Sequence, residues 1–145
     1  MSLEEMLLRD ELRREPAQSG EIRRLIDAAT RRLEDAANTS IHPETRLEQA
    51  YHAILNCALV GLRAENLRAV NAPGKHRFVL ESLADTLGTA PRLIAYFQQL
   101  RDLRHRDIYE GSIHVSEREA EDAVTEASRL LEHLRAWLEA RGDKS

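Results

Sequence analysis

The sequence predicts an all-α fold, an up-and-down antiparallel bundle of five to six helices. Ala, Leu, Glu and Arg dominate the 145 residues and all favour helix, whereas glycine occurs only six times and proline four times. Apolar residues recur at spacings of three and four, as on the buried face of a helix, and no stretch alternates convincingly as a strand does. Short loops between long helices favour antiparallel neighbours, which predicts the up-and-down order.

Capping and breaking residues divide the chain into helical segments. Ser116 and Glu119 have the spacing of a capping box, Pro43 and Pro91 suit the first turn of a helix, and Gly88 suits a helix end. We expect helices at about residues 3–14, from 21 to near 38, 43–66, from the turn at 71–74 to Gly88, 91–110, and 117–141.

The length predicts one domain over residues 1–145, with 1–16 as an N-terminal helical extension and 142–145 as a frayed tail. The segment 43–67 is apolar over more than one face, which predicts a central helix and a second subunit that covers part of it. We therefore expect a homodimer.

Charge and cysteine usage narrow the function classes. A net charge of −4 argues against a protein that coats nucleic acid along its whole surface, although a local basic patch remains compatible with it. The single cysteine, Cys57, lies in an apolar helix, as a buried residue in a reducing compartment does. No segment has the length and apolar character of a membrane span, and the first residues lack the order of a signal peptide. We expect a cytoplasmic protein without membrane association.

The end of the segment 91–110 is the first candidate site. Its apolar stripe, continued by one turn beyond Leu103, reaches Arg104 and Asp107. A charge at a half-buried position costs several kcal/mol unless it is paired. Two explanations stay open: Arg104 and Asp107 form an ion pair, within the chain or at a dimer interface, or Arg104 contacts the phosphate of a nucleotide or RNA.

Two basic segments stand at helix ends. Lys75, His76 and Arg77 open one helix, and the segment 101–106 closes another. Two interpretations stay open. In the first, both segments are solvated helix ends. In the second, they converge and form a basic pocket that binds phosphate; its residues would be Arg101, Arg104, Lys75 and His76, with Asp107 beside them. On the central helix, His52 and Asn56 are four residues apart, which predicts a surface hydrogen-bonded pair or a lining of the dimer groove.

Several kinds of chemistry lack their residues. The Gly74-Lys75 pair does not make a phosphate-binding loop, because His76 stands where serine or threonine is needed. No Glu-x-x-His or His-Glu-x-x-His pattern occurs, and the histidines are scattered. We expect no metal and no cofactor.

The segment from Arg104 to Gly111, Arg-His-Arg-Asp-Ile-Tyr-Glu-Gly, resembles the signature of HEPN domains, which are helical bundles found in higher eukaryotes and prokaryotes. Their motif has an arginine, a polar residue, a short spacer and a histidine; here Arg104 matches the arginine, His105 takes the polar position and Tyr109 stands where the histidine belongs. The helix with Tyr51 to Asn56, the turn 73–76 and the helix end 101–106 follow in the order of prokaryotic members, so the resemblance covers about residues 20–140.

The resemblance implies a function. Active HEPN proteins are homodimers that cleave RNA without metal, with the ribose 2′-hydroxyl as nucleophile, histidine as acid or base and arginine on the phosphorane. Tyrosine is almost wholly protonated at pH 7, so Tyr109 does not replace the base. The resemblance therefore implies a catalytically degenerate protein that binds a nucleotide, an RNA phosphate or a nucleotidyltransferase partner in a prokaryotic toxin–antitoxin or defence-type system. The alternatives are a metal-independent endoribonuclease that uses Arg104 with His105 or Tyr109, and a structural adaptor without a ligand.

Overall fold

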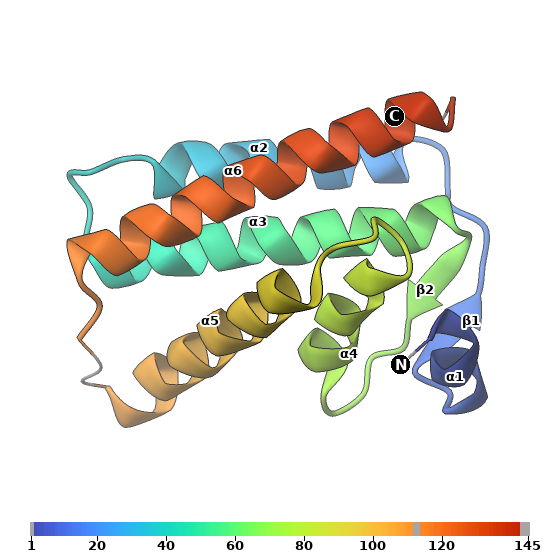
Figure 1. Cartoon of the computed structure of the whole chain (residues 1–145), viewed down its shortest axis with the longest axis horizontal. Coiled ribbons are helices and arrows are strands. Elements are labelled where there is room, and N and C mark those ends of the chain that lie inside the picture. The colour runs from blue at the N-terminus through green and yellow to red at the C-terminus, as the bar shows by residue number, and fades with distance from the viewer. Residues whose placement is uncertain (1, 112–113, 143–145) are drawn as a thin grey trace.

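The computed structural model describes residues 2–111 and 114–142 and confirms the all-α bundle (Figure 1). Its long helices are α2 (Glu21–Ala36), α3 (Pro43–Ala64), α5 (Pro91–Glu110) and α6 (Glu117–Ala140). Shorter elements are α1 (Leu3–Leu8), α4 (Lys75–Glu81) and the 3-10 turn η1 (Ser82–Ala84). The predicted capping box is present: the Ser116 hydroxyl accepts from the Glu119 amide, and the Glu119 side chain accepts from the Ser116 amide.

Helix α3 is the centre of the molecule. It packs against α2, α5 and α6, and it also contacts α4, η1 and β2 (Leu67–Ala69). Buried residues lie all round it, from Leu47 through Ala50, Ile54 and Cys57 to Leu62. The wide apolar face that the sequence analysis assigned in part to a second subunit is therefore covered by the chain's own helices.

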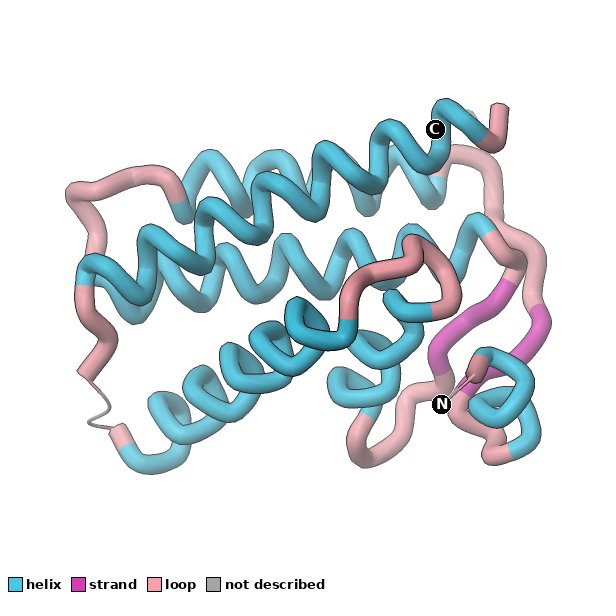
Figure 2. Tube along the Cα trace, in the orientation of Figure 1, coloured by secondary structure: helices cyan, strands magenta, loops and turns pink. Residues whose placement is uncertain are grey.

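The prediction of one helix over 3–14 was wrong. Helix α1 ends at Leu8, Asp10 has the left-handed φ of 59°, and the chain continues as the strand β1 (Leu12–Arg14). β1 pairs antiparallel with β2, with Leu12 opposite Ala69 and Arg14 opposite Leu67 (Figure 2). Met6 and Leu12 are buried in the core, so residues 2–16 are part of the packed fold and are not a helical extension. Of the expected tail 142–145, residues 143–145 lie outside the described residues.

Helix α4 is also shorter than expected. It ends at Glu81, and the segment to Gly88 continues through η1 and a turn. The hydroxyl of Ser82 donates to the Val79 carbonyl, and that of Thr86 donates to the Ser82 carbonyl. These local bonds compete with a continuous helix.

Two buried arginines brace the bundle. Arg46 of α3, 1% exposed, donates from Nε to the Ala36 carbonyl at 2.8 Å, and its guanidinium also pairs with Glu117 and Glu121 of α6. Arg63, at the other end of α3, donates to the carbonyls of Pro16 and Leu67. Both therefore satisfy backbone carbonyls with a charged donor.

Candidate functional site

A cluster of charged, imidazole and phenol side chains lies where the first half of α3, the start of α4 and the second half of α5 meet. We call it the Tyr51 cluster, and its members are Glu48, Tyr51, His52, His76, Arg101 and Arg104. Helix periodicity places Glu48, Tyr51 and His52 on one side of α3, because they are three or four residues apart. The turn at Gly74, which has the left-handed φ of 81°, starts α4 and brings His76 beside them.

Tyr51 is the centre of this cluster. Its ring is buried, and its hydroxyl lies 3.2 Å from Nδ1 of His76. Burial raises the pKa of Tyr51 to about 12, against the effect of the nearby Arg104, so the phenol keeps its proton at neutral pH. A protonated phenol can donate to Nδ1 of a neutral His76 or accept from it, according to which ring nitrogen carries the proton.

Arg104 lies over the ring of Tyr51. Its guanidinium carbon is 5.7 Å from the centre of the Tyr51 ring, and its Nε donates to Oε1 of Glu48 at 3.3 Å. Arg104 thus pairs with Glu48 of α3, and the ion pair with Asp107, one of the alternatives from the sequence, is not formed within the chain. The reason is packing. Because α5 lies on α3, the side chain of Arg104 faces α3 and not Asp107 in the next turn of its own helix.

His52 shares the same carboxylate. Its Nε2 lies 3.4 Å from Oε1 of Glu48, the oxygen that Arg104 also contacts. The expected partner of His52 was Asn56, one turn later, and the structure places Glu48, one turn earlier, in that role. Burial lowers the pKa of His52, and the charges of Arg104 and Arg32 add to the decrease.

Three cations act on His76. Burial is the largest cause of its lowered pKa, followed by Arg104, with further contributions from Lys75 and Arg101. The beginning of α4 and the second half of α5 therefore lie close together. Arg101 is held by Gln98 Oε1, which accepts from its Nε at 2.8 Å, and by Asp102 at 3.2 Å.

Of the other predicted site residues, His105 and Tyr109 lie apart from this cluster. His105 and Tyr109 stack on each other with ring centres 4.5 Å apart, and Tyr109 is 75% exposed. Asp107 lies in a narrow crevice with Glu44, Glu48 and Arg104 that has no room for a ligand. The catalytic set of Arg104, His105 and Tyr109 is therefore not assembled around Arg104 within one chain.

The sequence analysis missed the roles of Glu48 and Tyr51. The spacing of Glu48 and His52, four residues apart on one helix, was a usable signal for their pairing. No local signal ties Tyr51 to His76 or to Arg104, because these contacts join three different helices.

Within residues 2–111 and 114–142, no group of three or more His, Cys, Asp or Glu side chains is placed to hold a metal ion. None of the helices in that same part of the chain is both long and apolar enough to cross a membrane. Comparisons of the chain with protein-family models, with curated proteins and with solved structures find no match.

Proposed function

We propose that this helical bundle binds the phosphate group of a nucleotide or an RNA at the Tyr51 cluster. The observation that supports it best is the convergence of Lys75, Arg101 and Arg104 around the half-buried His76. The chain as a whole carries a net charge of −4, so a concentration of cations around a partly buried imidazole needs an explanation. A bound anion supplies one, because it would offset the mutual repulsion of these groups.

The donors at this place suit a phosphate. The guanidinium of Arg104 is planar and forms paired hydrogen bonds to phosphate oxygens. The imidazole of His76 adds a ring nitrogen that can donate, while Lys75 and Arg101 supply further charge. Neither Lys75 nor Arg77 has an ion pair within the described residues, so both remain available to a ligand or to solvent.

The biological setting rests on the resemblance to HEPN domains. A degenerate HEPN protein of this kind would act as a homodimer in the cytoplasm, as the partner of a nucleotidyltransferase in a prokaryotic toxin–antitoxin or defence-type system. The placement of His105 and Tyr109 away from Arg104 favours binding over catalysis at the motif itself.

A metal-independent ribonuclease is the second candidate, and one observation favours it. His52 and His76 both lie beside Arg104, and their lowered pKa values keep them neutral and able to accept a proton at pH 7. Cleavage of a single-stranded RNA in the presence of a chelator, lost in His52→Ala or His76→Ala, would support this candidate.

The test of phosphate binding is calorimetric titration of the protein with pyrophosphate and with a short oligoribonucleotide. We expect binding that weakens about 10- to 100-fold in Arg104→Ala, the loss of one or two charge-assisted hydrogen bonds. Affinity for the oligoribonucleotide should also fall as salt increases.

Arg31→Ala is the matched control, because Arg31 is exposed on α2 outside the cluster. Equal affinities in the native protein, Arg104→Ala and Arg31→Ala, or no binding by any of them, would reject the proposal. A neighbouring gene for a small nucleotidyltransferase, and co-purification of its product with this protein, would support the partner role.

A further inference from the structure

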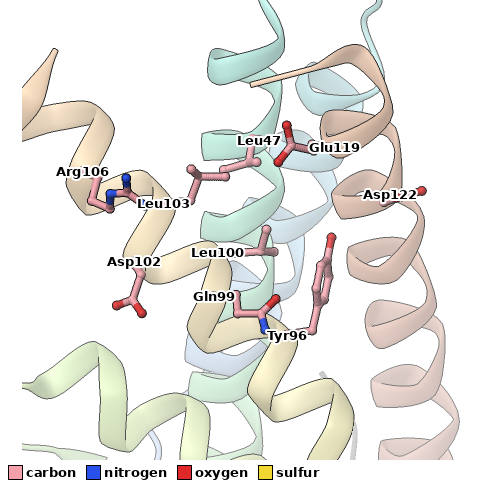
Figure 3. A pocket seen from close by; sticks show the side chains of 9 residues that line it. All are labelled: Leu47, Tyr96, Gln99, Leu100, Asp102, Leu103, Arg106, Glu119 and Asp122. Carbon is pink, nitrogen blue, oxygen red and sulfur yellow. The ribbon is translucent and has the colours of Figure 1, made fainter. Parts of the chain in front are cut away.

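A groove runs between α5 and α6, because both helices pack on α3 more extensively than on each other. Figure 3 shows the part of this groove near Leu100 and Leu103, where Tyr96 stands between the two helices. Three carboxylates and one guanidinium line this part, and they belong to Asp102, Glu119, Asp122 and Arg106. This part of the groove is therefore unfavourable for an anion.

The groove has a different character at the start of α5. A hollow of about 350 Å³, a size typical of small-molecule sites, lies there between the segment 88–90 and the middle of α6. Its charged lining has an excess of cations, because Arg92 and Arg129 stand against the single carboxylate of Glu126. Its apolar lining consists of buried or half-buried side chains, those of Leu93, Phe97 and Leu130.

The hydroxyl of Thr89 is an unsatisfied polar group in the wall of this hollow. Thr89 is 6% exposed, and its Oγ1 is buried without a hydrogen-bond partner among the described residues. A buried hydroxyl without a partner is unfavourable, because it has lost its hydrogen bonds to water and gained none in return. The hydroxyl therefore calls for a partner that the chain itself does not supply.

The N-terminus of α5 supplies further donors next to Thr89. The backbone bonds at this turn run from Leu93 and Ile94 to the Ala90 carbonyl, and the Arg92 amide has no acceptor within residues 2–111 and 114–142. The guanidinium of Arg92 is exposed and forms no ion pair in that same part of the chain, whereas Arg129 pairs with Glu126 at 2.8 Å.

The first turn of α5 leaves the positive end of the helix dipole without a counter-charge of its own. Its sequence from Pro91 to Ile94 contains no acidic residue, and it contains the cation Arg92 instead. An anion seated at this end of the hollow would be stabilised by the free amide, by the guanidinium and by the dipole together.

We propose that this hollow binds a small organic acid that has a carboxylate head and an apolar body. The carboxylate would accept from the Thr89 hydroxyl and from the Arg92 amide, beside the Arg92 guanidinium. The apolar body would lie on Leu93, Phe97 and Leu130, which adds affinity only for a ligand that carries hydrocarbon. The hollow shares no residue with the Tyr51 cluster, so this inference does not depend on phosphate binding there.

An NMR titration with three probes tests the class of ligand. Hexanoate has both parts, hexanamide keeps the shape of hexanoate but lacks its charge, and acetate lacks the hydrocarbon chain. We expect hexanoate to shift the amide resonances of Arg92 and Leu93 until they saturate, and to bind at least about tenfold more tightly than hexanamide or acetate. No shift at these amides with hexanoate would overturn the proposal. Equal affinity for hexanamide would overturn the anion site, and equal affinity for acetate would overturn the role of the apolar lining.

Two variants test the donors. Thr89→Val keeps the shape of the side chain and removes the hydroxyl, so hexanoate affinity should fall about tenfold. The thermal stability of Thr89→Val without ligand should be equal to that of the native protein or higher, because an unsatisfied buried hydroxyl is gone. Arg92→Gln, at an exposed position where folding is not at risk, should weaken hexanoate binding about threefold.

Matched controls are Thr45→Val on α3 and Arg23→Gln on α2, both at exposed positions outside the hollow, and both should bind hexanoate as the native protein does. Thr89→Val that is less stable and binds hexanoate with unchanged affinity would give the hydroxyl a structural role and overturn the proposal. Should Thr89→Val fail to fold, unchanged affinity in Arg92→Gln would overturn it independently.

Discussion

The guanidinium carbon of Arg104 lies 5.7 Å from the centre of the Tyr51 ring, and the Tyr51 hydroxyl lies 3.2 Å from Nδ1 of His76. One buried phenol thus contacts a cation through its ring and an imidazole through its hydroxyl. Its ring offers a cation–π contact to Arg104, and its hydroxyl shares a hydrogen bond with His76. The consequence is that Tyr51 joins residues from three helices, α3, α4 and α5.

Replacement of Arg104 should separate a structural role from a binding role. The side chain is 22% exposed and its partner Glu48 is 33% exposed, so loss of the pair in Arg104→Ala should change the free energy of unfolding by only about 1 kcal/mol. Pyrophosphate binding should be lost, and Arg104→Lys should recover only part of it because lysine lacks the paired donors. A large loss of stability with unchanged binding would show a structural role instead.

Removal of the Glu48 charge should strengthen anion binding. In the folded protein this carboxylate contacts both Arg104 and His52, so it competes with a phosphate for the same donors. We expect Glu48→Gln to bind pyrophosphate about three- to tenfold more tightly. Glu34→Gln on the exposed face of α2 is the control and should leave the affinity unchanged. Weaker binding in Glu48→Gln would mean that the carboxylate orients Arg104 for the ligand.

The two histidines should make stability depend on pH. The pKa values of His52 and His76 in the folded protein lie below 6.5. At a pH between 6.5 and these lowered pKa values, the unfolded chain therefore binds more protons than the folded protein does. The stabilisation is therefore present above pH 6.5 and is lost as pH falls through the folded pKa values. Urea unfolding at pH about 7.5 and about 5.5 measures this difference.

A His52→Gln/His76→Gln double variant should show a smaller change between these two conditions. The exposed His133→Gln is the matched control and should behave as the native protein does. Glu15 and Glu21 have pKa values lowered below 4.5. They therefore change their protonation only in more acidic solution and do not contribute to the difference in stability between pH about 7.5 and about 5.5. An unchanged difference in the double variant would contradict the assignment.

Arg46 should contribute to the stability of the bundle. Arg46→Ala removes a fully buried side chain and leaves the Ala36 carbonyl, at the end of α2, without its donor. We expect a loss of about 3 kcal/mol in the free energy of unfolding, mostly from the cavity and the unpaired carbonyl, because Glu117 and Glu121 are largely exposed. Arg46→Met, which fills the space, should lose less. An equal loss of unfolding free energy in Arg46→Ala and Arg46→Met would show that the ion pairs with Glu117 and Glu121 supply the stabilisation.

The long helices could be predicted because their signals are local. The spacing of apolar residues, the capping box at Ser116 and the prolines at Pro43 and Pro91 act within one or two turns, and the structure has helices where they predict them. The strand pair escaped because each strand has only three residues and its stability comes from a partner more than fifty positions away. A helix pattern over 3–14 gave no warning of the left-handed backbone at Asp10.

The amino-acid sequence by itself determined the helical class, the position of the long helices and which residue types gather near the end of α5. Only the tertiary structure decided which of them meet. Arg104 and Glu48 are 56 positions apart, and their contact exists because α5 packs on α3 at one angle and register. The same packing leaves His105 and Tyr109 at the exposed end of α5. Helix formation depends on neighbours along the chain, whereas a site depends on how helices dock, and docking is decided by the sum of many weak contacts that no short motif records.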